Sequence, residues 1–329
     1  MATVHGVTAT QTAFTERPLS PEDASAVTEL LAAWERADPA DHHYTETDIR
    51  EEFGAPDAAL DGGGVAVLDG ERVVAYGLLY VVAQEPEWVA YSDGGVHPDV
   101  HRRGVGRRVL DRQVDQARRL WQAQCPDRPG EVRVGVAETR VGAIAALTAA
   151  GFTTRRYFLR MRADLIVLGP VERSDPPGIH IRPYRQADDE AVRSVSNAAF
   201  SDHWGSTPRD AESWRAQFTE ASSFRPGASF VAERDGVIVG FLLAGEHDAD
   251  TAQRGHRTGY VTRLGTVRSA RGQGVGTVLV ARALAAMRES GCTEAELDVD
   301  ADSPTGAGRL YERLGFVVFG RERLLTRQL

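Results

Sequence analysis

The chain repeats itself, and this internal repeat constrains the fold more than any other feature of the sequence. Motifs of the first half recur in the same order in the second half, displaced by about 164 to 170 residues. The clearest pair is HRRGVGRRVL, which begins at His101, and RGQGVGTVLVARAL, which begins at Arg271. Two copies of one structural plan explain this order better than a single large α/β domain with chance similarity.

Each copy is predicted to contain the same elements: strand, helix, hairpin, strand, glycine turn, helix, strand, helix and strand. The hairpins turn at Asp-Gly pairs that begin at Asp69 and Asp235. Between the copies, a segment with Pro-Pro-Gly breaks every periodicity. The sequence therefore predicts an N-terminal unit over residues 1–163, a linker over 164–178 and a C-terminal unit over 179–329, both of mixed α/β class.

The charge and cysteine content exclude several classes of function. The 329 residues carry a net charge of -9, and all 38 basic residues counted as Lys+Arg are Arg. This balance argues against sequence-independent nucleic-acid binding and suits a cationic substrate. Cys125 and Cys292 are too few for a disulfide framework or a metal cluster. Without a long apolar run or a signal-like N-terminus, we expect a cytoplasmic protein with no metal and no membrane contact.

The glycine turn of the second half indicates a phosphate site. Gly272, Gly274 and Gly276 precede a helical run, where unpaired backbone N–H groups and the helix dipole favour an anion. A P-loop is excluded because the chain has no Lys, and the spacing does not fit the dinucleotide-binding fingerprint. A pyrophosphate group is the natural ligand of such a turn.

Two motifs in the second half resemble the GNAT superfamily of acyl-CoA-dependent N-acyltransferases. LGTVRSARGQGVG is similar to the strand and coenzyme A turn of that superfamily. LDVDADSPTGAGRLYERLGF, ending at Phe316, is similar to its next strand and helix. The motifs stand about 40 residues apart in the expected structural order. The first half carries weaker versions of both.

The resemblance implies a fold and a cofactor. Each half would form a mixed, mostly antiparallel sheet with a splayed central strand pair and flanking helices. Acetyl-CoA would lie with its pantetheine arm along Leu264, Gly265 and Thr266. Its pyrophosphate would meet the turn formed by Arg271, Gly272, Gln273, Gly274, Val275, Gly276 and Thr277. Ser303 stands where relatives often carry an Asn beside the pantetheine arm.

Acyl transfer to an amine needs an unprotonated nucleophile, donors for the developing oxyanion and an acid for the leaving thiolate. By the resemblance, Tyr311 would be the general acid and backbone N–H groups of residues 264–266 the oxyanion donors; a half-buried packing role for Tyr311 is the alternative. The strand over 259–267 lacks the acid that many relatives use as a base. Glu246 and His247 are candidates for the base, or belong to a solvated loop rim.

Three residues are candidates for binding the acceptor, a primary amine of a small molecule. His203 and Trp204 lie in the segment that faces the substrate in the superfamily, although such a pair can also be a structural plug. Asp298 shares one face of a strand with Asp300, where the two could attract an amine or cap the sheet edge in water.

The first half departs from the motifs of the second. Arg103, Gly104 and Gly106 keep coenzyme A binding open, but Leu147 replaces the Tyr at the acid position. We therefore expect catalysis in the second half only. The tandem arrangement is similar to that of mycothiol synthases, which implies the cysteinyl amine of a thiol-sugar conjugate as one candidate acceptor. An antibiotic or another secondary-metabolite amine is the other candidate acceptor. A non-catalytic acyl-CoA-binding protein is the alternative function. We expect a monomer or a homodimer.

Overall fold

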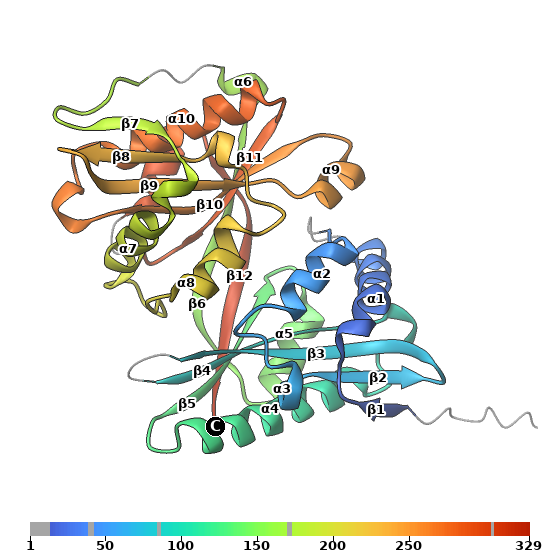
Figure 1. Cartoon of the computed structure of the whole chain (residues 1–329). Coiled ribbons are helices and arrows are strands. Elements are labelled where there is room, and N and C mark those ends of the chain that lie inside the picture. Colours follow the sequence, from blue (N-terminus) through green and yellow to red (C-terminus); the bar gives the residue numbers. More distant parts are fainter. Residues whose placement is uncertain (1–13, 39–42, 84–86, 170–172, 304–305) are drawn as a thin grey trace, which may run out of the picture.

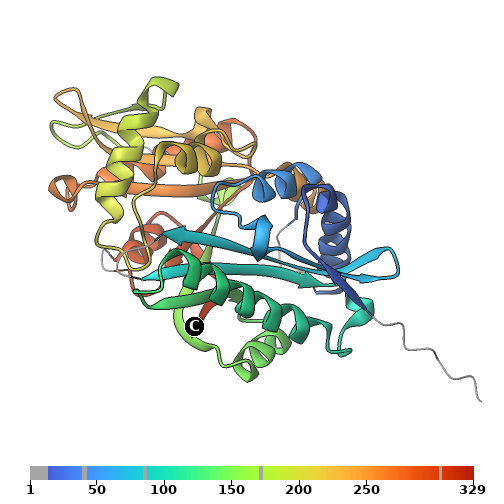
Figure 2. The same cartoon turned by 60° about the horizontal axis from the view of Figure 1, so that its bottom comes forward.

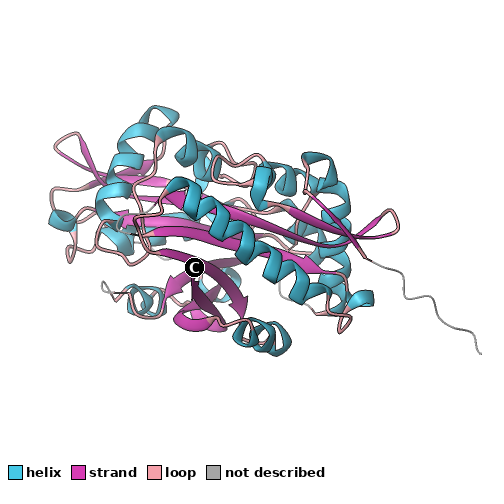
Figure 3. Ribbon diagram, turned by 90° about the horizontal axis from the view of Figure 1, so that it is seen from below, coloured by secondary structure: helices cyan, strands magenta, loops and turns pink. Residues whose placement is uncertain are grey.

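All twelve strands of the described chain form one continuous sheet with helices on both faces (Figures 1 and 3). The computed structural model describes residues 14–38, 43–83, 87–169, 173–303 and 306–329. The sheet order is β1-β2-β3-β4-β5-β12-β6-β11-β10-β9-β8-β7. Only the β4/β5 and β10/β11 pairs are parallel, so the predicted mixed, mostly antiparallel class is confirmed.

The elements follow the predicted order in both halves. The first half contains β1 (Thr15–Arg17), α1 (Ala24–Ala37), α2 (Glu46–Phe53), α3 (Leu60–Gly63), β2 (Val65–Asp69), β3 (Arg72–Ala83), β4 (Trp88–Val96), α4 (Val105–Gln124), β5 (Gly130–Ala137), α5 (Val141–Ala149) and β6 (Thr153–Asp164). After α6 (Leu165–Leu168), the second half contains β7 (His180–Pro183), α7 (Asp189–Phe200), α8 (Ala211–Trp214), β8 (Phe230–Arg234), β9 (Val237–Gly245), α9 (Asp248–Arg254), β10 (Thr258–Thr266), α10 (Val275–Glu289), β11 (Glu294–Asp300), α11 (Ala307–Arg313) and β12 (Val317–Gln328).

The last strand of each half is exchanged into the sheet of the other half. Strand β6 pairs with β11 of the second half, and β12 pairs with β5 of the first. The two exchanged strands also pair with each other, and Figure 1 shows them running between the two lobes. Their side chains join the other half's core: Met161 of β6 is 0% exposed and Leu325 of β12 is 1% exposed.

This exchange was not predicted from the sequence. The proposed units 1–163 and 179–329 remain divisions of the sequence, and strand pairing crosses them. The proposed linker over 164–178 begins with the end of β6 and the short helix α6, while residues 170–172 lie outside the described part of the chain.

The central strand pair of each half separates, as the resemblance implied. Strands β10 and β11 are in register only from Thr258 to Tyr260, although β10 continues along β9 to Thr266. Strands β4 and β5 likewise pair only from Trp88 to Tyr91. Since each glycine turn follows the free end of β4 or β10, each half has an open strand edge next to a helix N-terminus.

Long helices pack on the sheet directly after the glycine turns. Helix α10 buries most of one face in the core of the second half, and α4 runs along the first-half strands (Figure 2). Apolar residues at helical spacing explain both contacts. None of the helices among the described residues has the length and apolar composition needed to cross a membrane.

Candidate active site

The glycine turn of the second half has an open backbone that suits an anion. Gly272 and Gly274 adopt φ angles of 73° and 83°, a region that favours glycine. A Cβ added at either position would meet nothing within 4 Å. Helix α10 starts directly after Gly274, so the N–H groups of its first turn have no partner within the helix. The turn therefore exposes donors with free space in front of them.

Arg271 begins this turn and is held by the end of α7. Its guanidinium donates to the Asp202 carboxylate at 2.7 and 3.1 Å and to the Ala199 carbonyl at 2.7 Å. Arg268 adds a third donor to Asp202 at 3.2 Å. These bonds to Arg271 hold the pKa of Asp202 well below its usual range. A phosphate bound at the turn would thus meet an Arg that already has an acidic neighbour.

A single large cavity connects the glycine turn with the space between the two halves. Its volume is about 1530 Å³, and its lining contains residues of both halves. The predicted residues that line it are Leu264, Gly265, Thr266, Arg271, Gly272, Gly274, Val275, Gly276, Thr277, Ser303, Tyr311, His203, Trp204 and Asp298. The structure thus brings most of the predicted site together in one cavity.

Five predicted residues do not line this cavity. Gln273 is turned away, since its amide donates to the Ser269 carbonyl at 2.8 Å and accepts from Arg234. Arg103, Gly104 and Gly106 belong to the first-half turn, where the Arg103 guanidinium lies 4.6 Å from the centre of the Phe14 ring. The fifth is Glu246, described below.

Tyr311 reaches the cavity from the short helix α11. It is 7% exposed, and its ring packs edge-on against Phe316 at 5.8 Å. None of the hydrogen bonds found among the described residues involves its hydroxyl. Burial raises the pKa of Tyr311 to about 12, so the phenol keeps its proton throughout the physiological pH range. A protonated hydroxyl that faces a cavity can act as a hydrogen-bond or proton donor.

Strand β10 is bulged where it enters the cavity. Its pairing with β9 shifts between Val261 and Arg263, which leaves Thr262 as the extra residue. A bulge re-aims the side chains and N–H groups beside it. Thr262, Arg263 and Leu264 all line the cavity next to the opening between β10 and β11. The strand therefore presents irregular backbone at the place where an acyl group is expected.

The structure does not favour Glu246 as a base. This residue follows β9, is 5% exposed and is absent from the cavity lining. Its carboxylate accepts hydrogen bonds from Arg257 at 2.6 and 2.7 Å, and Arg225 lies 3.6 Å away. Hydrogen bonding to Arg257 lowers the pKa of Glu246, which opposes proton uptake. His247 does line the cavity and packs against Tyr260.

The predicted acceptor residues His203 and Trp204 also connect elements. His203 packs 4.9 Å from the Phe200 ring, and burial lowers its pKa. The Trp204 ring contacts two guanidinium groups, with that of Arg133 on β5 at 4.3 Å and that of Arg156 on β6 at 4.8 Å from its centre. Trp204 therefore fastens the α7–α8 loop to the first half while one part of it faces the cavity.

Four of the carboxyl side chains that line the cavity have raised pKa values: Glu52, Asp93, Asp298 and Glu322. Burial, with repulsion between neighbouring carboxylates, raises the pKa of Glu322 to about 7 and that of Glu52 to about 8. The pKa values of Asp93 and Asp298 are also raised by burial. Gly135 gives the Glu322 carboxyl its space, since a Cβ there would lie 2.3 Å from it. Asp300 differs, because it is paired with Arg156 at 2.6 Å.

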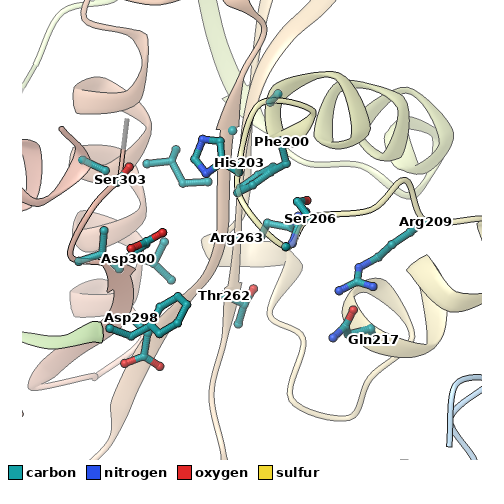
Figure 4. A pocket seen from close by; sticks show the side chains of 18 of the residues that line it. Phe200, His203, Ser206, Arg209, Gln217, Thr262, Arg263, Asp298, Asp300 and Ser303 are labelled. Atoms are coloured by element: carbon teal, nitrogen blue, oxygen red, sulfur yellow. The ribbon is translucent and has the colours of Figure 1, made fainter. Parts of the chain in front are cut away.

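Several cavity residues carry no signal in the sequence motifs. Glu52, Asp93 and Glu322 come from the first-half lobe and the exchanged strand, and Arg209 and Arg263 lie near α8 and on β10. Figure 4 shows Arg209 and Gln217 on the side of Thr262 opposite to Asp298 and Asp300. Only the approach of the two halves brings these residues together.

Comparison with known proteins identifies the family. The sequence pattern of the Acetyltransferase (GNAT) family matches twice, over residues 25–152 and 190–316. The chain belongs to the GNAT acetyltransferase family. The two matched regions also confirm the tandem GNAT repeat.

Curated relatives of this GNAT chain span nearly its whole length. The mycothiol acetyltransferase of Parafrankia sp. (strain EAN1pec) is 30% identical over 321 residues, which cover 91% of this chain and 93% of that protein. The mycothiol acetyltransferase of Thermobispora bispora is 30% identical, with 90% and 93% covered. The chain is therefore an acyltransferase with a tandem architecture like that of mycothiol synthases.

Solved tandem GNAT structures share the fold. A tandem GNAT protein from the clavulanic acid biosynthesis pathway aligns with a TM-score of 0.74 at 20% identity, covering 96% of this chain and 98% of that one. A GCN5-related N-acetyltransferase from Sphaerobacter thermophilus aligns with a TM-score of 0.72 at 24% identity, covering 96% and 95%. At these identities the likeness concerns the GNAT fold alone.

Proposed function

We propose that the chain is a cytoplasmic, acetyl-CoA-dependent N-acetyltransferase that transfers an acetyl group to a primary amine of a small molecule. The observation that carries this proposal is the single cavity that joins the glycine turn, the open edge of β10 and Tyr311. Only the second half contributes all three features to the cavity, so we assign catalysis to that half.

The residues present fit coenzyme A. The turn has unobstructed glycines at 272 and 274, and the helix that follows offers unpaired N–H groups to a pyrophosphate. Arg271 would add a positive charge beside it. Leu264, Gly265 and Thr266 would hold the pantetheine arm on the open strand edge. Bound acetyl-CoA would supply the acetyl group as a thioester.

The protein's own groups would then serve the chemistry in three ways. Backbone N–H groups of residues 264–266, which follow the bulge at Thr262, would donate to the acyl oxygen as negative charge develops on it. Tyr311 would give its proton to the leaving sulfur, a role that its raised pKa and its place in the cavity support. Asp298 and Glu322 would attract the acceptor as an ammonium ion. The base that removes the ammonium proton stays unassigned.

A mycothiol acetyltransferase activity is the second candidate. The full-length match to proteins of that name favours it. In this chain, however, the strand over 259–267 carries no acid, and the Tyr260 hydroxyl on that strand donates to Asp250. Assaying the thiol-sugar acceptor beside other amines decides between the two candidates.

Thiol release tests the proposal directly. Purified protein is titrated with acetyl-CoA by calorimetry and then assayed for free coenzyme A with a panel of amines that includes the thiol-sugar acceptor of mycothiol acetyltransferases. We expect acetyl-CoA to bind and amine-dependent thiol release to follow. Tight binding without release from any amine would support the non-catalytic alternative, and absence of binding would refute the cofactor assignment.

A further inference from the structure

Two partly buried arginines of the cavity, Arg209 and Arg263, have no acidic partner among the described residues. The chain has more acidic than basic residues, 47 against 38. Of the other two arginines in the cavity lining, Arg271 is paired with Asp202 and Arg313 is exposed. Arg209 and Arg263 line the cavity, yet neither forms an ion pair within 4.0 Å in the described part of the chain. Such an arrangement suits an anion that comes with a ligand.

Arg263 is held in place by contacts that leave its terminal nitrogens free for a ligand. It follows the bulged residue Thr262 on β10. Its Nε donates to the Ser196 hydroxyl at 2.7 Å, and the guanidinium carbon lies 4.0 Å from the centre of the Phe200 ring. The Phe218 ring covers it from another direction at 5.1 Å. The Nη1 and Nη2 atoms make no hydrogen bond to any described residue.

The backbone of Arg209 is held by hydrogen bonds, and its side chain lines the cavity. The Asn197 side chain accepts from the Arg209 N–H and donates to the Arg209 carbonyl, both at 3.0 Å. Arg193 donates to the same Arg209 carbonyl at 2.7 Å. The Arg209 side chain lies 5.7 Å from the Phe218 ring, and its Nε is buried without a hydrogen-bond partner in the part described. A donor left in this state carries a desolvation cost that an acceptor atom would offset.

The electrostatics of the two arginines agree with this geometry. Burial lowers the pKa of both, and repulsion from Arg209 contributes to lowering that of Arg263 to about 9. Asp57 attracts Arg209, but no ion pair joins them within 4.0 Å. In Figure 4, Ser206 and Gln217 lie, like the two arginines, on the side of Thr262 opposite to Asp298 and Asp300. We call the side with Arg209 and Arg263 the cationic wall and the side with Asp298 and Asp300 the acidic wall, although Asp57 also lines the cavity.

We infer that the acceptor amine also carries an anionic group, a carboxylate or a phosphate, which Arg209 and Arg263 bind. This inference rests on the proposed function and narrows its substrate class. A guanidinium matches two oxygens of either anion. The contact of the Arg263 guanidinium with the Phe200 ring and the hydrogen bond from its Nε to Ser196 pre-orient this group. With its anion on this wall, the acceptor directs its amine toward the bulge at Thr262 and the acidic wall at Asp298.

Matched acceptor pairs test the inference. The wild-type protein is assayed for thiol release with amino acids against their carboxamides, and with phosphoethanolamine against ethanolamine. We expect kcat/KM for the anionic member of at least one pair to exceed that of its neutral partner by about 10- to 100-fold. Amino acid carboxamides have the less basic amine, so a preference for the acid cannot come from a larger fraction of free amine.

Variants assign the preference to the two arginines. In each of the variants Arg209→Gln and Arg263→Gln, kcat/KM for the anionic member divided by kcat/KM for the neutral member should fall to about 1. Calorimetry should show unchanged acetyl-CoA binding in both variants. Arg263→Lys, which keeps the charge but not the fork, should retain part of the ratio. Arg185→Gln makes the same charge change at an exposed site outside the cavity lining and should leave the ratio unchanged.

The outcomes separate this inference from the proposed function. Two results would overturn the inference and leave the cofactor assignment standing. In the first, the protein binds acetyl-CoA but has equal kcat/KM for both members of every pair. In the second, it binds acetyl-CoA but neither binds nor acetylates any anionic member. A preference for the anionic member that survives in both Arg209→Gln and Arg263→Gln would overturn it as well. Loss of acetyl-CoA binding in the wild type would instead count against the proposed function.

Discussion

The glycine turns of the two halves have nearly the same backbone and different side chains. Gly104 and Gly274 precede α4 and α10 with φ angles of 81° and 83°. Two residues earlier, Arg102 adopts φ 60° where Gly272 adopts 73°, so the first half keeps the conformation without the glycine. The duplication has therefore preserved the shape of the turn more strictly than its sequence.

The side chains show where the two halves diverge. His101 and Arg271 reach the equivalent backbone carbonyl, with the His101 ring nitrogen 2.9 Å from Val96 O and Arg271 Nε 3.4 Å from Thr266 O. The imidazole has one further ring nitrogen, whereas the Arg271 guanidinium has two further nitrogens, which donate to Asp202 and the Ala199 carbonyl. The two turns therefore share a backbone conformation but differ in the side-chain donors beside it.

The acid position separates the halves further. Tyr311 faces the cavity, whereas Leu147 belongs to the buried core of the first half and is 6% exposed. An alkyl chain has no proton to donate, so the first half lacks the group to which we assign the general acid role. It does contribute acidic side chains to the cavity lining, such as Glu52 and Asp93.

The largest effect is expected from Tyr311→Phe. Removing the hydroxyl should lower kcat by about 100-fold or more, because general acid catalysis typically contributes 10²–10⁴-fold. Acetyl-CoA affinity should change little. Steady-state thiol release together with calorimetry measures the two effects. Tyr157→Phe, a half-buried Tyr outside the cavity lining, is the matched control.

Full turnover by Tyr311→Phe would show that the second half does not owe its activity to this hydroxyl. The pH profile adds a second check. Since the pKa of Tyr311 is about 12, its ionisation should not produce an alkaline fall in kcat below about pH 10.

A smaller effect is expected when the turn residues are exchanged. Arg271→Gln should weaken acetyl-CoA binding by about 10-fold, because hydrogen bonds to charged groups contribute about 1.5–3 kcal/mol. His101→Gln, at the equivalent place, should change the dissociation constant by less than about twofold if the first half does not bind the cofactor. Calorimetry at fixed ionic strength measures both constants.

The pair between Arg271 and Asp202 supplies the control for this prediction. Asp202→Asn breaks the ion pair but leaves the guanidinium free for a phosphate, so binding should be equal to that of the wild type or stronger. Equal weakening by Asp202→Asn and Arg271→Gln would instead mean that the pair acts only by positioning α7.

The smallest effect is expected on stability, from Glu322→Gln on the exchanged strand β12. The raised pKa of Glu322, about 7 against 4.5 for an unperturbed Glu, means that the folded protein binds this proton more tightly than the unfolded chain. Its contribution to stability is complete below pH 4.5 and is lost as the pH rises to about 7. Glu322→Gln should therefore be about 1–2 kcal/mol more stable than the wild type at pH 8 and nearly equal to it below pH 5.

Urea unfolding at the two pH values measures this difference. Glu312→Gln, at an exposed position on α11, should give no pH-dependent gain. An equal stability of Glu322→Gln and the wild type at pH 8 would contradict the burial of this carboxyl between the two lobes.

Much of the site could be predicted from the sequence because it is local. The glycines at 272 and 274, the open strand at 264–266 and Tyr311 lie within two short motifs, and the cavity contains them all. The residues that were missed, such as Glu322 and Arg209, belong to no motif. Glu246 was a candidate base because it follows the second arm of the hairpin. Its ion pairs with Arg225 and Arg257 depend on how three segments pack together, which the sequence does not show.

The sequence by itself determined the two copies, the order of their elements, the positive-φ turns and the divergence at Leu147 and Tyr311. Periodicity and glycine placement act over a few residues, so they can be read directly. Only the tertiary structure decided that β6 and β12 change places and that one cavity spans both halves. An alternating strand satisfies its own pattern beside either partner sheet, and the choice depends on pairing between residues more than a hundred positions apart.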